Sequence, residues 1–262
     1  MRIVLIGSGN LATNLGVALK NAGHQIVQVY SRTMEHAHEL AIRLGAVPTH
    51  QIEQVSDNAD VYILSLKDSV LPNILPTLCK GKSDKIFLHT AGSLPMDIFA
   101  GFAVHYGVFY PMQTFSKERL VDFKAIPCFI EACDAPTRDL LQALSRSITT
   151  KVYPLSSADR QYLHLAAVFS CNFVNHCYEI SSELLARHHI PFSVMLPLID
   201  ETARKVHSLL PSDAQTGPAV RYDENVIERQ KALLSDEPSW AHIYKQMTAS
   251  IHQTATTKRE HD

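Results

Sequence analysis

The 262-residue sequence lacks several features that mark large classes of proteins. Its five cysteines are an odd count without paired metal-ligand spacing, which argues against a disulfide framework and against a zinc site. Apolar runs are too short to span a bilayer, and a net charge of −2 gives no basis for binding nucleic acid or an anionic membrane. A charged leader with a cleavage site is also missing. We therefore expect a cytoplasmic protein with no metal site, no nucleic-acid partner and no membrane contact.

The most informative segment is a glycine-rich turn between a predicted strand at 2–6 and a predicted helix at 11–22. Gly7 permits a tight turn, Gly9 lets the backbone approach a pyrophosphate, and Ala12 allows close packing of helix on strand. The pattern predicts a dinucleotide site at the first amides of the helix, and the alternative is an ordinary strand–helix turn. The predicted cofactor contacts here are Gly7, Ser8, Gly9, Asn10, Leu11 and Ala12.

The end of the second predicted strand, 25–30, indicates which dinucleotide binds. Sites that prefer NAD usually place Asp or Glu here to accept a hydrogen bond from the ribose 2′-hydroxyl. This chain has Ser31, Arg32 and Thr33 instead. A guanidinium flanked by hydroxyl donors suits a 2′-phosphate, so the pattern favours NADP over NAD. Alternatively Ser31 or Thr33 caps the helix predicted at 35–44, and both roles are compatible.

Strands and helices alternate through the first half of the chain, which predicts a Rossmann-type, largely parallel α/β sheet over 1–153. Strand signals then vanish, and 154–262 is predicted as an all-helical domain. Further strands are expected at 60–65, 85–89, 103–109, 126–131 and 151–153, and helices at 68–78, 135–147, 156–187, 194–210, 223–234 and 239–251, with a frayed tail at 254–262. Ligands of such sheets bind beyond the carboxyl ends of strands. We therefore expect further cofactor contacts from Ser65, Leu66, Lys67, Thr90, Ala91 and Gly92.

The long predicted helix is apolar on nearly all sides, which predicts burial on several faces. At 3.6 residues per turn, His164, Cys171 and Asn175 fall on almost one line, with Asn172 beside it. Buried polar groups need partners, so this stripe suggests a substrate site. His164 would donate or accept a proton, while Asn172 and Asn175 would hold a substrate carbonyl or carboxylate. The alternative is a set of core side chains bonded to helix ends or loops.

Taken together, these features resemble a family of Rossmann-like proteins with a helical C-terminal domain of unknown function, within the group of pyrroline-5-carboxylate reductase, 6-phosphogluconate dehydrogenase and β-hydroxyacid dehydrogenases. The resemblance spans residues 1–253. It rests on the segments 6–12, 66–68, 89–93, 110–115, 164–172 and 216–221. It implies NADP binding in a cleft and a helical domain that forms a homodimer. Gln113 in the fourth of these segments is a further candidate substrate contact.

The chain departs from related proteins at several positions. The family often has His where Tyr110 stands and Gly where Tyr222 stands. The β-hydroxyacid dehydrogenases carry a catalytic lysine four residues before an asparagine, whereas here His164 is followed at that distance by Val168. A lysine-based mechanism is therefore not expected. Lys67 is expected to contact the cofactor, as its equivalent does in pyrroline-5-carboxylate reductase.

The loop at 215–223 has two interpretations. Pro218 prevents a continuous helix, so the loop is on composition a helix connector. Placed at the domain cleft, Thr216 and Arg221 would instead contact substrate, with Arg221 pairing with a carboxylate.

The sequence thus predicts an NADP-dependent oxidoreductase that transfers hydride between nicotinamide and a small carbonyl, imine or hydroxy compound. A protein that senses NADP without turnover is the first alternative, because no catalytic lysine is found. A fold that binds another nucleotide, or none, is the second.

Overall fold

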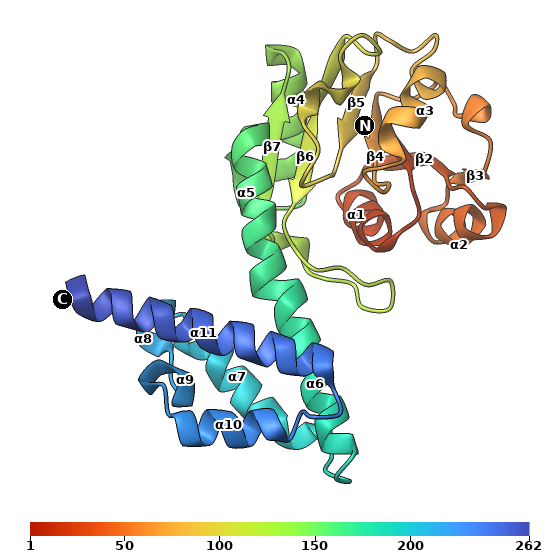
Figure 1. Cartoon of the computed structure of the whole chain (residues 1–262). Coiled ribbons are helices and arrows are strands. Elements are labelled where there is room, and N and C mark those ends of the chain that lie inside the picture. The colour runs from red at the N-terminus through yellow and green to blue at the C-terminus, as the bar shows by residue number, and fades with distance from the viewer. Residues whose placement is uncertain (262) are drawn as a thin grey trace. The chain divides into compact units, whose positions relative to one another are not determined.

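The computed structural model describes residues 1–261, and its first part is built on one sheet in the order β3-β2-β1-β4-β5-β6-β7-β8 (Figure 1). All neighbouring strands are parallel except β6 and β7. The strands are β1 (Arg2–Ile6), β2 (Gln25–Tyr30), β3 (Val47–Thr49), β4 (Val61–Leu64), β5 (Ile86–His89), β6 (His105–Pro111), β7 (Cys128–Ala132) and β8 (Val152–Pro154). The predicted Rossmann-type sheet is confirmed, and the short edge strand β3 was not foreseen.

Helices cover both faces of this sheet. They are α1 (Asn10–Asn21), α2 (Met34–Leu44), α3 (Leu71–Leu78) and α4 (Ala135–Arg146), with short 3₁₀ turns η1 (Ile52–Gln54), η2 (Met96–Phe99) and η3 (Phe123–Ala125). One apolar core joins α1, α2 and α4 to one face, and a second joins α3 and η2 to the other. Strand β1 serves both cores, since Ile3 and Leu5 point into the first and Val4 and Ile6 into the second.

The remaining elements are helical, as predicted. They are α5 (Ser157–Ala167), a π-helical stretch η4 (Val168–Phe173), α6 (Val174–Ala186), η5 (Phe192–Met195), α7 (Leu196–Lys205), α8 (Pro211–Ala214), α9 (Pro218–Arg221), α10 (Glu224–Ala232) and α11 (Pro238–His261). The chain divides into two compact units, 1–171 and 172–262. The first unit therefore extends beyond the domain boundary predicted at 153, because α5 is bonded to the sheet loops.

Three details of the helical prediction are wrong. The long helix is not one α-helix, because η4 interrupts it, and the helix expected at 194–210 ends at Lys205. The tail expected to fray is helical through His261, with Asp262 outside the described residues. An ion pair from Lys258 to Asp213 holds it, and Thr254 Oγ1 donates to the Ser250 carbonyl one turn earlier at 3.0 Å.

The predicted burial of the long helix is also not seen within one chain. Arg160 is the one buried residue of α5, whereas Tyr162 is 76% exposed and Leu165 52%. The chain's own core therefore does not bury these two side chains. No helix within residues 1–261 is both long enough and apolar enough to cross a bilayer.

Candidate functional site

Parallel pairing brings six strand ends to one edge of the sheet. Strands β3, β2, β1, β4, β5 and β6 are neighbours in that order and run the same way, so their carboxyl ends meet. The strand order reverses between β1 and β4, because the chain builds β2 and β3 on one side of β1 and β4 on the other. Open α/β sheets bind ligands at such a switch point. All the cofactor contacts predicted from the sequence lie in the loops at this edge or in the first turn of α1.

The glycine turn after β1 is shaped by close backbone approach. Gly7 has φ +126°, and a Cβ there would lie 2.3 Å from the Ser65 carbonyl oxygen, so only glycine fits. A Cβ at Gly9 would meet nothing within 4 Å, which leaves open space above the backbone that begins α1. Ala12 is fully buried, as its packing role requires. The turn therefore presents exposed helix amides with room for an anion.

The loop after β2 contacts the glycine turn directly. Ser8 Oγ donates to Ser31 Oγ at 2.8 Å, and both side chains are buried. Thr33 precedes α2, but its hydroxyl contacts the His36 ring at 2.9 Å rather than capping a backbone amide. Arg32 is exposed, and within the described chain its guanidinium makes no hydrogen bond or ion pair. The Arg32 guanidinium, in the loop that contacts the glycine turn through Ser31, therefore has no partner among the described residues.

The loops after β4 and β5 continue the same edge. Thr90 Oγ1 donates to the Leu64 carbonyl at 3.3 Å and to Ser65 Oγ at 3.2 Å, so the two loops are held together. Ser65 and Leu66 are half-buried, whereas Lys67 is exposed. Lys67 therefore presents a second cation to this edge.

His164 lies against the loop after β5. A Cβ added to Gly92 would be 2.5 Å from both Cγ and Nδ1 of His164, so the imidazole packs directly on the glycine backbone. Its Nδ1 is 3.0 Å from the hydroxyl of Tyr110 at the end of β6, and the two rings meet edge to face. A contacting pair, His164 of α5 and Tyr110 of β6, therefore lies at the β6 end of this edge.

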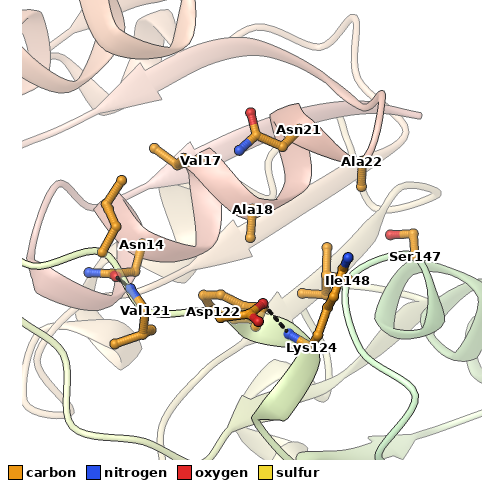
Figure 2. A pocket seen from close by; sticks show the side chains of 12 residues that line it. Asn14, Val17, Ala18, Asn21, Ala22, Val121, Asp122, Lys124, Ser147 and Ile148 are labelled. Atoms are coloured by element: carbon orange, nitrogen blue, oxygen red, sulfur yellow. Dashed lines mark hydrogen bonds between the residues drawn. The ribbon is translucent and has the colours of Figure 1, made fainter.

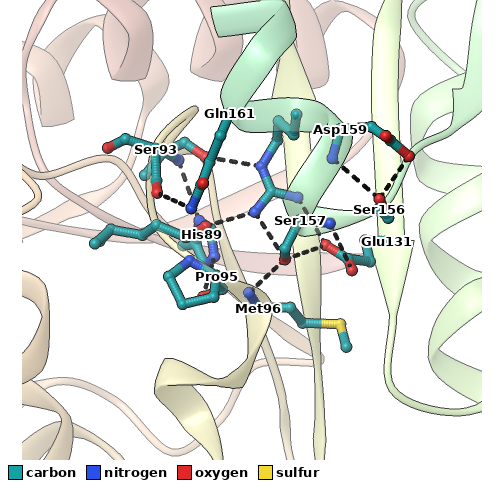
Figure 3. A network of polar contacts seen from close by, with 12 residues as sticks. His89, Ser93, Pro95, Met96, Glu131, Ser156, Ser157, Asp159 and Gln161 are labelled. Atoms are coloured by element: carbon teal, nitrogen blue, oxygen red, sulfur yellow. Dashed lines mark hydrogen bonds and ion pairs between the residues drawn. The ribbon is translucent and has the colours of Figure 1, made fainter.

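A buried arginine, Arg160, fixes α5 in this position, and Figure 3 labels Glu131 and Ser157 in the polar network to which it belongs. Arg160 is 1% exposed, and its guanidinium forms an ion pair with Glu131 of β7 at 2.7 Å. It also donates to the carbonyls of Ala91 and Leu94 in the loop after β5. Because His164 follows Arg160 by four residues, it lies on the same face one turn further along.

Burial and this guanidinium also set the ionisation of neighbouring groups. Burial, reinforced by the Arg160 charge, lowers the pKa of His89 to about 4. Its Nδ1 accepts from the Ala91 amide at 3.1 Å and its Nε2 is 3.3 Å from the Pro95 carbonyl, so His89 is a neutral structural residue. Burial raises the pKa of Tyr110, while Arg160 acts in the opposite direction. Tyr110 is therefore a neutral phenol at physiological pH.

The predicted substrate residues belong to different compact units of the chain, and their role stays a prediction. Gln113 is exposed, and its Oε1 accepts from the next backbone amide, Thr114, at 2.9 Å. Asn172, Asn175, Thr216 and Arg221 belong to the second compact unit and are exposed.

The π stretch also changes the predicted stripe on the long helix. A π turn holds more residues than an α turn, so positions beyond Val168 are rotated relative to a 3.6-residue register. The predicted alignment of His164 with Cys171 and Asn175 is therefore wrong.

Sequence reasoning missed Tyr110 and Arg160 as parts of the site. Tyr110 follows the strand predicted at 103–109, so its place at the end of the next parallel strand was a usable signal. Arg160 gave no such signal, because an arginine in a first helical turn usually faces solvent.

A separate pocket of about 340 Å³ lies along α1, away from the glycine turn (Figure 2). It runs from Asn14 to Ala22 and is closed by residues 120–124 and by Ser147 and Ile148. Asn14 accepts from the Val121 amide at 3.1 Å and donates to the Ser116 carbonyl at 2.8 Å, which anchors the loop. No group of three or more His, Cys, Asp or Glu suited to a metal occurs in the part of the chain that is described.

Comparison with known families matches both parts of the chain. Residues 2–91 match the family described as NADP oxidoreductase, coenzyme F420-dependent, and residues 126–251 match a domain of unknown function, DUF2520. No curated protein matches the sequence.

Solved structures extend this likeness to the whole chain. An inferred NADP oxidoreductase from Bacteroides fragilis is 53% identical, with 96% of this chain and 98% of that chain covered and a TM-score of 0.94. An imine reductase from Myxococcus stipitatus in complex with NADP⁺ is 13% identical, with 98% and 95% covered and a TM-score of 0.71. A pyrroline-5-carboxylate reductase from Coxiella burnetii is 17% identical, with 97% of each chain covered and a TM-score of 0.58. The last two share the fold.

Proposed function

This chain belongs to the family of NADP oxidoreductases in which a coenzyme F420-dependent-type domain precedes a DUF2520 domain, and from that premise we propose that it transfers hydride between NADP and a small carbonyl, imine or hydroxy compound. The observation that carries the proposal is the contact of His164 with Gly92 and Tyr110. The His164 imidazole is a group that can transfer a proton, and it lies at the same edge of the sheet as the glycine turn. An NADP sensor without turnover would have no need for such a pair.

The residues at the strand edge fit a phosphorylated dinucleotide. The open backbone at Gly9 would receive the pyrophosphate, and the free guanidinium of Arg32 would receive the 2′-phosphate beside Ser31 and Thr33. Because Ser31 and Ser8 stand at one end of the edge, the adenosine half belongs there, and the nicotinamide half belongs near Thr90 and the loop after it. The nicotinamide supplies the hydride when bound.

The protein's own contribution is proton transfer and orientation. His164 exchanges the proton that must accompany hydride transfer to a carbonyl or imine. Asn172 and Asn175 retain their proposed role as substrate contacts, as do Gln113, Thr216 and Arg221.

The cofactor preference is testable without a known substrate. We expect NADPH to stabilise the native chain more than NADH or ATP at equal concentration, because a ligand that binds only the native state adds RT ln(1 + [L]/Kd) to stability. Arg32→Gln should weaken NADPH binding roughly 10- to 100-fold, since a charge-assisted hydrogen bond contributes about 1.5–3 kcal/mol. Binding of NADH should be unchanged. Thermal shift and calorimetry measure both effects.

A matched control is Arg43→Gln, which removes an arginine at the other end of α2. It should leave NADPH binding unchanged. Equal affinity for NADPH and NADH in the unmodified protein would contradict the NADP assignment. NADPH oxidation with a panel of keto acids, aldehydes and imines then tests turnover, and binding without oxidation would favour the sensor.

We also propose that the chain forms a homodimer through its helical domain. Three leucines of this domain are strongly exposed in the single chain, Leu198 at 59%, Leu210 at 68% and Leu233 at 82%. Leu198 lies on α7, Leu210 precedes α8 and Leu233 follows α10. A contiguous exposed apolar patch marks an interaction surface, and we propose that these leucines belong to one.

Light scattering should therefore give twice the chain mass of 29.2 kDa. Replacing Leu198, Leu210 and Leu233 together by serine should raise the dimer dissociation constant at least tenfold, because each buried leucine contributes about 1.5–3 kcal/mol. Ile42→Ser is the control, since Ile42 is 68% exposed on α2 of the sheet domain. A monomeric unmodified chain would overturn the proposal.

A further inference from the structure

The hydrogen bond between Tyr110 and His164 has a direction that can be worked out from the surroundings of the phenol. Tyr110 is 8% exposed, and burial raises its pKa, so its oxygen carries a proton that needs an acceptor. His164 Nδ1, at 3.0 Å, is the one acceptor that the described residues offer to this hydroxyl. If Nδ1 carried the proton instead and donated to the phenol oxygen, the phenol's own proton would be left without a partner.

That direction fixes the tautomer of the imidazole. A neutral histidine has one N–H and one bare nitrogen, so an Nδ1 that accepts from Tyr110 leaves the proton on Nε2. The Gly92 backbone contacts the Cβ, Cγ and Nδ1 side of the ring, and Nε2 lies at the other side. Across residues 1–261, Nε2 has no hydrogen-bond partner of its own. The group that His164 offers to a ligand is therefore an N–H donor.

We infer that Tyr110 is a positioning residue that holds His164 in the Nε2–H tautomer, and that the substrate presents a hydrogen-bond acceptor to it, a carbonyl oxygen or an unprotonated imine nitrogen. This inference rests on the proposed function for the identity of the reaction. A protonated iminium ion has no lone pair at nitrogen, so it cannot accept from Nε2–H. The substrate class is thereby narrowed to neutral carbonyl compounds and neutral imines.

The same geometry provides the proton balance of a reduction. As hydride adds to the substrate carbon, the π electron pair moves to oxygen or nitrogen, and that atom takes the proton from Nε2. The phenol proton moves to Nδ1, so the imidazole is neutral again with its proton on the other nitrogen. Solvent supplies a proton to the Tyr110 oxygen as the phenol proton leaves, because burial disfavours a lasting phenolate even though the Arg160 charge acts in the opposite direction.

The tautomer can be measured in the full chain without cofactor or substrate. In ¹⁵N-labelled protein at a pH where the imidazole is neutral, the His164 signals are assigned by their loss in the His164→Asn variant. We expect the proton on Nε2 in the unmodified protein. In Tyr110→Phe, which keeps the ring and removes the hydroxyl, we expect the ring to populate both tautomers.

Tyr106→Phe is the matched control, because Tyr106 lies on the same strand and its ring packs on Phe99. It should leave the His164 signals unchanged. A proton on Nδ1 in the unmodified protein, or an unchanged tautomer in Tyr110→Phe, would overturn the inference. Because this readout needs no turnover, a failure to find a substrate would count against the proposed function and not against the tautomer.

Discussion

Replacing Arg160 by methionine should lower the free energy of unfolding by about 3–5 kcal/mol, which is the cost of removing one partner from a buried ion pair. The guanidinium is 1% exposed and bonds Glu131 at 2.7 Å, Ala91 O at 3.2 Å and Ser157 Oγ at 3.1 Å. Methionine fills a similar volume and supplies none of these donors. The Glu131 carboxylate then keeps its bonds from Ser157 but loses its cationic partner, and the Ala91 and Leu94 carbonyls lose the Arg160 donors, which explains the large expected cost. Urea unfolding followed by circular dichroism measures the change.

Arg204→Met is the control for this experiment. Its ion pair with Glu201 at 3.8 Å is exposed, with side chains 69% and 59% accessible. Exposed pairs on a helix contribute well under about 1 kcal/mol, so the control should be close to the unmodified protein. If both variants lost the same small amount, Arg160 would not be the main link between α5 and the sheet domain.

The pH dependence of the Arg160 effect has a definite sign. Burial acts to raise the pKa of Glu131, but hydrogen bonds from Ser157 and Arg160 outweigh it, and the pKa is lowered from 4.5. A lowered folded-state pKa stabilises the native state above the unfolded-state value, and this stabilisation is lost as pH falls through the folded-state value. The difference between the unmodified protein and Arg160→Met should therefore be largest near neutral pH and narrow below about pH 4.5.

Local sequence signals were sufficient to predict the backbone geometry at the strand edge where we propose that the dinucleotide binds. Gly7 and Gly9 follow a buried strand within a few residues, so their environment depends on short-range geometry, and the structure gives each the space that was expected. The strand-end residues Ser65 and Thr90 meet because parallel pairing places successive carboxyl ends together. The shape of the glycine turn and the meeting of the strand ends both follow from the order of strands and helices along the chain.

The His164–Tyr110 pair, to which we assign proton transfer, depends on long-range contacts that sequence periodicity does not predict. The meeting of Tyr110 with His164 requires the pairing of β5 with β6 and the docking of α5 on the loop after β5. That docking is set by Arg160, whose burial depends on Glu131 and loop carbonyls far away in the chain. The π stretch has no recognised sequence signal, so the register beyond Val168 could not be foreseen.

His164→Ala should lower kcat by about 10²–10⁴ for reduction of a neutral carbonyl or imine, which is the usual contribution of a positioned general acid. The side chain is half-buried against Gly92, so its removal leaves the backbone turn in place. NADPH affinity should be nearly unchanged, because the proposed phosphate contacts lie at the other end of the strand edge. Stopped-flow oxidation of NADPH at saturating substrate measures the chemical step.

A permanently charged N-alkyl iminium ion is the sharpest control for that result. It cannot accept from Nε2–H, so we expect the unmodified protein to reduce it more slowly than a neutral imine, but it accepts hydride and needs no proton at nitrogen. If His164 acts as a proton donor, His164→Ala should lower the rate of reduction of the neutral substrate and leave the rate of reduction of the iminium ion almost unchanged. An equal loss for both would show instead that the imidazole shapes the pocket or orients the cofactor. Tyr110→Phe should follow the same pattern with a smaller loss, since it acts on the reacting atoms only through the His164 ring.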